Sequence, residues 1–366
     1  MGLRAGGRMT DALRTDPAGG GGFTLSGDPR AEARVARDLQ LVVTAVREHL
    51  PDAEAVVLVG GFGRGEGAVV VGPDGPVPYN DYDLVVVVPD EAEAWPALRA
   101  AARSLRGRLA VDAVDLIPRA RDRWTRLEPS MFHVDLRAGG RVLHGAPDLL
   151  ERLPVYGPDA VGPADAAVLM RNRLVTCLEA HPGLATAPVS LRQSAKVVLA
   201  WVDAEACLRG TYATSYREKI RGIEAWAGPD EVAAAEWALA VRAGSSGGED
   251  QAMARWLAAA DLLARGLRRV HGDPDARAPA FLARWVGEEV RALGLVGALR
   301  RLRVGRLESP LHGAQAALVL SPHDPAAGRW ADRLLAAYGG AGGSERWLDA
   351  ARTSVRLWYE VFHDAA

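Results

Sequence analysis

The first half of the chain combines one helical pattern with several short apolar runs. From Ala31 to Leu50, apolar side chains recur every three or four residues, which predicts an amphipathic helix ending at Pro51. Three apolar runs follow at 55–59, 84–88 and 109–117, separated by turn-rich or helical segments. This arrangement is typical of strands in a sheet that helices cover.

Two further strands are expected near the end of this half. The segments Phe132–Leu136 and Val142–Leu143 are apolar, and Ala138-Gly139-Gly140-Arg141 lies between them. Adjacent glycines favour a tight turn, so the pattern predicts a hairpin.

Helical spacing dominates the second half of the chain. Residues 150–164 contain three prolines and two glycines, a density of breakers that predicts a domain boundary. Beyond it, six segments carry apolar residues at helical spacing: 166–178, 191–208, 231–241, 252–270, 281–293 and 347–362. These segments predict an all-helical region.

The expected fold class is therefore α+β in two domains. Residues 29–155 should form a small mixed sheet with flanking helices, and residues 165–366 a helical domain. Residues 1–28 include four consecutive glycines and have little to bury, so we expect a mobile tail.

Composition excludes several classes of protein. At 366 residues, with 49% hydrophobic and 25% charged residues, the chain has the balance of a globular protein of two domains. The net charge of -2 provides no basic field for nucleic acid. Two cysteines do not make a disulfide framework, and no apolar run approaches the roughly 20 residues that span a bilayer. We expect a cytoplasmic protein with no membrane partner.

A glycine-rich segment follows the first apolar run. Gly60-Gly61-Phe62-Gly63 comes directly after Val56–Val59. Glycines at the end of a strand let backbone N–H groups approach phosphate oxygens closely. The segment lacks the Lys-Ser/Thr of a P-loop and the spacing of a dinucleotide fingerprint, so by itself it is as consistent with a structural turn.

Two carboxylates open the next apolar run. Asp81 and Asp83 precede Leu84–Val88 and are two residues apart, so in a strand both side chains project from one face. Adjacent like charges are costly unless a cation neutralises them. Together with the glycine segment, the pair favours a metal site that holds a nucleotide.

A strand, Gly-Gly-Phe and then Asp-Tyr-Asp on the next strand resembles the superfamily of DNA polymerase β and the smaller antibiotic nucleotidyltransferases. The resemblance covers approximately Leu39 to Leu143. In that superfamily the glycine turn holds the triphosphate of an NTP and the paired aspartates bind two Mg²⁺ ions. The resemblance implies these roles for Gly60, Gly61, Phe62, Asp81 and Asp83.

The chain departs from this pattern in two respects. Phe62 stands where serine is common, and the connection from Gly63 to Asn80 is longer than usual. We interpret the turn-rich insert at residues 72–76 as a loop that extends the connection.

The superfamily also has a third carboxylate on a neighbouring strand, which acts on the metal that activates the acceptor hydroxyl or as its base. Asp115, in Val114-Asp115-Leu116-Ile117, is the favoured candidate for this catalytic and metal-binding position. Asp112 falls on the opposite face of the same strand because three residues separate the two. Asp112 and Asp135 remain alternatives.

Several other residues are candidates for phosphate contacts. Arg64 offers a fork of donors to a triphosphate. Glu66 is a candidate to orient Arg64, and a surface ion pair is the equal alternative for Glu66. In the helical half, residues 210–216 resemble the Gly-x-Tyr-x-x-Ser-Tyr stretch of the helical partner domain of nucleotidyltransferases. The candidates there are Lys196, Ser215, Tyr216 and Lys219. Lys196 and Lys219 are the only lysines in the chain. Packing and solvated charge are the competing interpretations.

The favoured function is a metal-dependent nucleotidyltransferase that moves an NMP from an NTP to a hydroxyl of a small acceptor such as a sugar, an antibiotic or a biosynthetic intermediate. Two Mg²⁺ ions are expected, with Mn²⁺ as a substitute, and the helical domain is expected to close over the cleft. The alternatives are nucleotidylation of a protein or RNA, and a silent nucleotide-binding module. The sequence does not distinguish among nucleobases, acceptors or oligomeric states.

Overall fold

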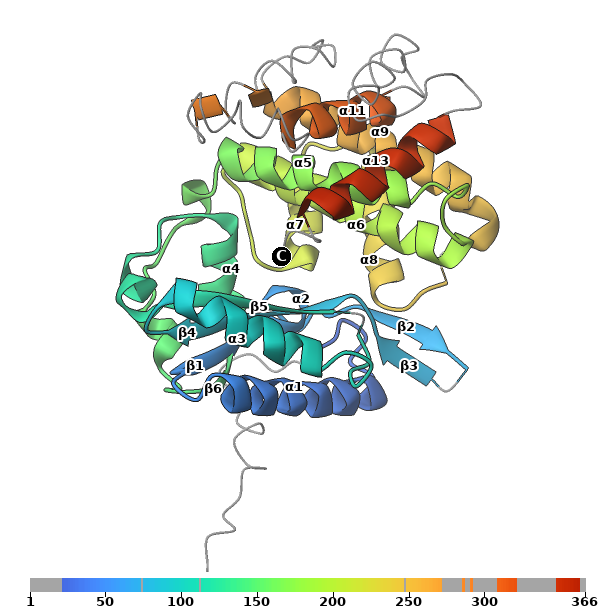
Figure 1. Cartoon of the computed structure of the whole chain (residues 1–366). Helices are drawn as coiled ribbons and strands as arrows, with labels where there is room; N and C mark the ends of the chain where they lie inside the picture. Colours follow the sequence, from blue (N-terminus) through green and yellow to red (C-terminus); the bar gives the residue numbers. More distant parts are fainter. Residues whose placement is uncertain are drawn as a thin grey trace, which may run out of the picture. The chain divides into compact units, whose positions relative to one another are not determined.

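The computed structural model describes residues 22–73, 75–111, 113–246, 248–271, 285–286, 290–291, 308–320 and 347–362. The fold is mixed α+β, and the chain divides into two compact units (Figure 1). Met1–Gly157 and Arg242–Ser245 form the first, which we call the sheet unit. Pro158–Val241 and Ser246–Ala366 form the second, the helical unit. The division at Gly157 falls within the breaker-rich segment.

The sheet unit is built on a four-stranded mixed sheet. Its strand order is β5 (Ala113–Ala120), β4 (Asp81–Val88), β1 (Ala55–Leu58) and β6 (Arg141–His144). β1 is antiparallel to β4 and to β6, whereas β4 and β5 are parallel. The two longest strands, β4 and β5, therefore begin at the same end of the sheet.

Helices cover both faces of this sheet. α1 (Pro29–His49) and α3 (Glu91–Ser104) pack on one face, against the even-numbered side chains of β4 such as Leu84 and Val86. On the other face, η1 (Arg121–Arg126), α4 (Met131–Gly139) and η2 (Leu149–Arg152) contribute to a second core with Val85 and Val87. The alternation of strand side chains supplies both cores.

The prediction of a hairpin at residues 132–143 is wrong for the first of its two strands. Phe132–Leu136 belongs to the helix α4, and only the second segment forms a strand, β6. The hydroxyl of Ser130 accepts a hydrogen bond from the N–H of His133 and caps the helix. Phe132 and Leu136 are four residues apart, so their spacing suits a helix as well as a strand.

The insert expected to be a loop instead contains a hairpin. β2 (Val69–Gly72) and β3 (Gly75–Pro78) pair as a separate two-stranded antiparallel sheet. The expected tail also needs correction over residues 22–28, because Thr24 is buried and bridges to Gly67. Residues 1–21 lie outside the described residues.

The described part of the helical unit contains helices joined by turns and loops, and no strand. The helices are α5 (Pro163–Glu179), α6 (Ala187–Leu208), α7 (Tyr216–Ile223), α8 (Pro229–Arg242), α9 (Ala252–Val270), α11 (Glu308–Leu320) and α13 (Trp347–Phe362), with the short helices η3 (Pro158–Ala160) and η4 (Glu249–Gln251). α6 is buried along most of its length and packs on α5 and α9. Most of the helix expected at 281–293 lies outside the described residues. Within the described segments, none of the helices has the length and apolar character needed to cross a membrane.

Candidate metal-binding site

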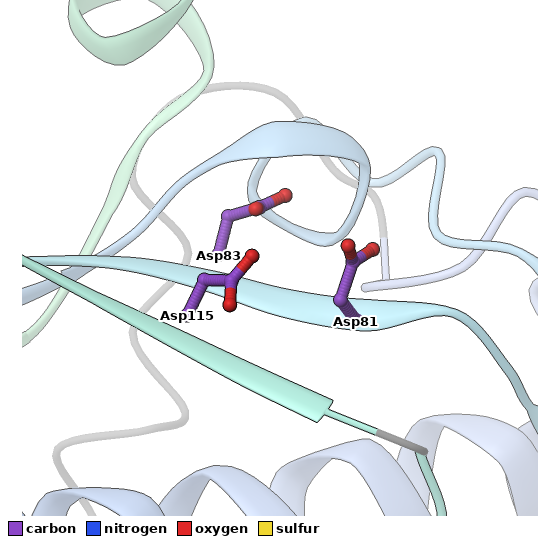
Figure 2. A group of neighbouring side chains, drawn as sticks. All are labelled: Asp81, Asp83 and Asp115. Atoms are coloured by element: carbon purple, nitrogen blue, oxygen red, sulfur yellow. The ribbon is translucent and has the colours of Figure 1, made fainter. Parts of the chain in front are cut away.

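Three aspartates converge where β4 and β5 begin. Asp81 and Asp83 are odd-numbered residues of β4, and the parallel register places Asp115 of β5 directly opposite Asp83. All three side chains therefore leave the same face of the sheet. One carboxylate oxygen from each lies within 4.8 Å of the others (Figure 2). Asp81 and Asp83 are half-buried, and Asp115 is exposed.

A left-handed residue starts the strand that carries two of these acids. Asn80 has φ of 85°, a conformation that asparagine tolerates better than most residues. Its side-chain amide donates to Oδ1 of Asp81. The turn thus fixes both the start of β4 and the direction of its first carboxylate.

Tyr82 anchors the same strand on its other face. Its buried hydroxyl donates to Asp38 Oδ2 at 3.1 Å, and the N–H of Ala110 donates to the same oxygen at 2.8 Å. Burial, with the charge of Asp38, raises the pKa of Tyr82 far above its usual range. Since Ala110 precedes β5, this one carboxylate on α1 holds both strands of the site.

The glycine segment approaches Asp83 closely. It forms a single helical turn, α2 (Gly60–Gly63), and Gly60 has φ of +65°. A Cβ at Gly60 would lie 2.4 Å from Asp83 Oδ2. The N–H of Val59 donates to the carbonyl of Asp83 at 2.9 Å. A glycine at this position leaves room for the carboxylate and for anything bound to it.

The residues of α2 offer backbone N–H donors, and one of them, Phe62, contributes its side chain to the core. Among the described residues, no backbone hydrogen bond uses the N–H groups of Gly60, Gly61 or Phe62. The Phe62 ring is buried and meets the Tyr82 ring edge-to-face at 4.8 Å. The side chain of Phe62 is therefore part of the core, and only its backbone N–H offers a contact to a ligand.

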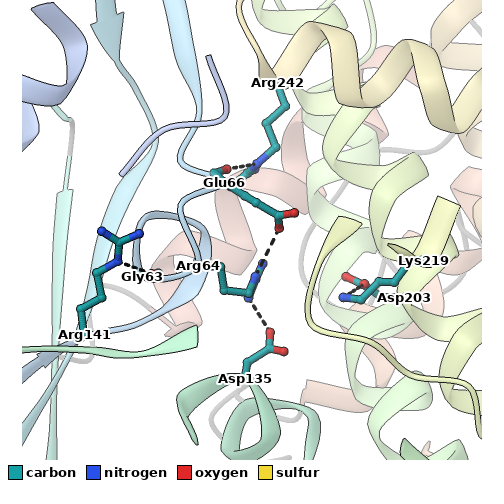
Figure 3. A network of polar contacts seen from close by, with 8 residues as sticks. All are labelled: Gly63, Arg64, Glu66, Asp135, Arg141, Asp203, Lys219 and Arg242. Atoms are coloured by element: carbon teal, nitrogen blue, oxygen red, sulfur yellow. Dashed lines mark hydrogen bonds and ion pairs between the residues drawn. The ribbon is translucent and has the colours of Figure 1, made fainter. Parts of the chain in front are cut away.

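Arg64 makes ion pairs on both sides (Figure 3). Its Nη1 lies 2.5 Å from Asp135 Oδ2 on α4, and its Nε lies 3.4 Å from Glu66 Oε2. The pair with Glu66 fits both an orienting role and a plain ion pair, so that role and a triphosphate contact by Arg64 stay predictions. Asp135 is thus a partner of Arg64 and is not part of the acidic cluster. Asp112 lies outside the described residues.

Two of the candidate phosphate contacts of the helical unit, Lys219 and Tyr216, lie at a buried ion pair. Lys219 Nζ lies 2.5 Å from Asp203 Oδ1, and the lysine side chain is 1% exposed (Figure 3). The ring centroids of Tyr212 and Tyr216 lie 4.3 and 5.0 Å from the same nitrogen. Ser215 precedes the first turn of α7 as its N-cap residue. The structure therefore brings Lys219 and Tyr216 together.

Lys196 is half-buried on α6, and its role as a phosphate contact stays a prediction.

The sequence interpretation missed Asp38. It lies on the apolar face of α1, three residues after Val35 and four before Val42, and is buried. A carboxylate on the apolar face of a helix is a signal that the sequence contains, because such a group needs a buried partner. The partner, Tyr82, is evident only from the folded chain.

The chemistry of the acidic cluster suits a hard cation. Its potential ligands are carboxylate oxygens alone, which Mg²⁺ and Mn²⁺ prefer, and it contains no histidine or thiolate. The space left by Gly60 lies beside one of these carboxylates. The residues present therefore fit the Mg²⁺ that the sequence resemblance implies.

Comparisons of this chain with protein-family models, curated proteins and solved structures find no match. The assignment of a function accordingly depends on the residues and geometry of the acidic cluster and of α2.

Proposed function

We propose that this protein is a metal-dependent nucleotidyltransferase that moves an NMP from an NTP to a hydroxyl of a small acceptor. The observation that carries the proposal is the convergence of Asp81, Asp83 and Asp115 beside a glycine turn whose first N–H groups make no backbone hydrogen bond within the described part of the chain. Transfer of a phosphoryl group depends mainly on positioning and on charge stabilisation, which are the functions that this arrangement offers.

Asp81 and Asp83 would hold the cations. When bound, divalent cations supply the positive charge that neutralises triphosphate oxygens and the charge developing in the transition state. Both carboxylates are half-buried and held in place through Asn80 and the Asp83 backbone, so their positions are set before a ligand arrives. The neighbouring N–H groups of Gly60 and Gly61 would donate to phosphate oxygens.

Asp115 is assigned to the acceptor side because it is the exposed member of the cluster. The acceptor oxygen attacks the α-phosphorus while the bond from that phosphorus to the β-bridging oxygen breaks and pyrophosphate leaves. Asp115 takes the proton of the attacking hydroxyl. Its position opposite Asp83 keeps this base beside the atoms that react.

A small acceptor is favoured over a nucleic acid because the chain has a net charge of -2. A silent nucleotide-binding module has less support, since such a module has no need for three converging carboxylates. A transfer assay on cell lysate distinguishes nucleotidylation of a protein from transfer to a small acceptor.

The test is incubation of the protein with Mg²⁺ or Mn²⁺, each of four α-labelled NTPs and a pool of sugars, aminoglycosides and nucleoside intermediates. We expect pyrophosphate release and a labelled small product. Asp83→Asn should lower this turnover by about 10²-fold or more, since a carboxylate of the metal site is lost. Asp52→Asn, a change at an exposed turn of the same unit, is the matched control and should leave turnover unchanged.

The proposal is overturned by two results. One is an absence of pyrophosphate release with every NTP and acceptor. The other is turnover in Asp83→Asn equal to that in Asp52→Asn.

A further inference from the structure

A pocket of about 640 Å³ lies entirely within the helical unit. Its walls come from α6, from the segment after α7, and from α8 and α9. This volume is in the range of sites for small organic ligands. No residue of the acidic cluster or of α2 lines it, and neither do Lys196, Ser215, Tyr216 and Lys219.

Guanidinium groups outnumber carboxylates in this pocket. Four arginines and two glutamates line it. Asp261 also pairs with Arg265, at 3.0 Å, so an excess of one positive charge remains. Arg268 forms no ion pair with an acidic residue of the described segments, and its side chain is half-buried. An unneutralised guanidinium in a recess is suited to bind an oxyanion.

The glutamates position the arginines. Glu205 is 3% exposed, and its Oε2 lies 2.8 Å from Arg269 Nη1 and 3.5 Å from Arg209 Nε. Burial raises the pKa of Glu205, although both arginines oppose the shift. Glu231 pairs with Arg265 at 2.5 Å. The guanidinium groups are thus held in place before a ligand binds.

Two tryptophans add a flat apolar wall. The Arg209 guanidinium lies 3.7 Å from the centroid of the Trp226 ring, and the rings of Trp226 and Trp201 meet edge-to-face at 6.0 Å. Trp226 is half-buried and lines the pocket. Indole rings and stacked guanidinium planes together suit a planar ring.

We propose that this pocket binds a small organic anion that combines a flat ring with a phosphate or carboxylate group. The ring packs against Trp226 and the stacked Arg209, and the oxyanion pairs with Arg268. This binding requires neither the acidic cluster nor a metal ion, so it stands or falls independently of the proposed transfer reaction.

The test uses the full chain in EDTA with no nucleotide present, and calorimetry with four probes. These are 1-naphthyl phosphate, 1-naphthoate, 1-naphthol and inorganic phosphate. The two ring anions are 1-naphthyl phosphate and 1-naphthoate. We expect at least one of them to bind about tenfold or more tightly than both 1-naphthol and inorganic phosphate. Only the ring anions use both the aromatic wall and Arg268. The tighter of the two ring anions identifies the preferred oxyanion.

Variants assign the binding to the pocket. Arg268→Ala should weaken the ring anion by about tenfold, and Trp226→Leu several-fold. Arg221→Ala removes an exposed arginine of the same unit outside the pocket and should change nothing. Circular dichroism and melting temperature check that each variant is folded.

The proposal is overturned if neither ring anion binds more tightly than inorganic phosphate and 1-naphthol. It is also overturned if Arg221→Ala weakens binding as much as Arg268→Ala, since the effect would then be one of net charge. Binding that survives both Arg268→Ala and Trp226→Leu places the ligand elsewhere.

Discussion

Asp115 differs from the other two members of the acidic cluster in being exposed. Under the proposed function, Asp115→Ala should lower transfer by about 10²-fold or more, because the base on the acceptor side is lost. Binding of the metal–NTP complex should remain largely intact, since Asp81 and Asp83 are still present. Steady-state turnover and calorimetry of NTP with Mg²⁺ measure the two effects separately, and retained turnover would remove Asp115 from the mechanism.

Gly60 is the residue at which conformation and site geometry coincide. Gly60→Ala should cost about 1–2 kcal/mol in the free energy of unfolding because of the left-handed φ. It should also weaken metal binding, because the new Cβ would lie 2.4 Å from Asp83 Oδ2. Urea unfolding and Mn²⁺ titration are the measurements.

Gly107 provides the matched control for this change. Its φ is +70°, and a Cβ there would meet nothing within 4 Å. Gly107→Ala should therefore lower stability by a similar amount and leave Mn²⁺ affinity unchanged. Equal loss of Mn²⁺ affinity in both variants would show that strain alone, and not the approach to Asp83, affects the site.

At the scale of elements, β4 is held to α1 by the bond between Tyr82 and Asp38. Tyr82→Phe keeps the ring packed on Phe62 but removes a hydrogen bond to a buried carboxylate. We expect a loss of about 1–3 kcal/mol in the free energy of unfolding. Metal affinity should stay close to wild type because Asp38 retains its bond from Ala110. A loss of metal-binding free energy larger than the loss of unfolding free energy would contradict this expectation.

The turn after α5 should make the helical unit sensitive to acid. Burial lowers the pKa of His181, and its Nδ1 accepts a hydrogen bond from the N–H of Gly183 at 2.9 Å. The folded state thus favours the neutral ring, so the unfolded chain binds a proton more readily. The stability contributed by His181 is present above its ordinary pKa of about 6.5 and is lost as pH falls below that value.

His181→Phe tests this dependence. Phenylalanine keeps an aromatic ring beside Trp256 and Trp347 but does not titrate. The difference in unfolding free energy between pH 7.5 and pH 5.5 should be smaller in the variant than in the wild type. Identical differences in the two proteins would show that His181 does not contribute.

At the scale of the whole molecule, the chain has two compact units, and both residues of the Lys219–Asp203 pair belong to the helical unit. Lys219→Met should destabilise that unit by about 3–5 kcal/mol because Asp203 is left as a buried charge. Adding Asp203→Leu should recover part of the loss. Mn²⁺ binding at the acidic cluster should not change while the protein is folded.

Tryptophan fluorescence suits this measurement, because Trp95 and Trp124 are the only tryptophans of the chain in the sheet unit. Unfolding followed by fluorescence therefore reports mainly on the helical unit. A Lys219→Met protein of normal stability that no longer binds NTP would instead support Lys219 as a phosphate contact.

The sequence by itself determined the local features of this protein. Alternation along residues 81–88 places Asp81 and Asp83 on one face, and helical spacing in most of the described helical unit is a property of each segment alone. The mixed α+β class follows from the same patterns. These conclusions needed no knowledge of distant residues.

Only the tertiary structure decided which of these elements meet. The parallel register places Asp115 opposite Asp83, the ion pair with Asp135 occupies Arg64, and the cap at Ser130 makes a helix of a segment whose spacing also suited a strand. Each of these depends on contacts between residues far apart in the chain or on a local competition that apolar spacing does not resolve. The pocket of the helical unit is the clearest example, because three helices and an intervening segment contribute the arginines, tryptophans and glutamates that line it.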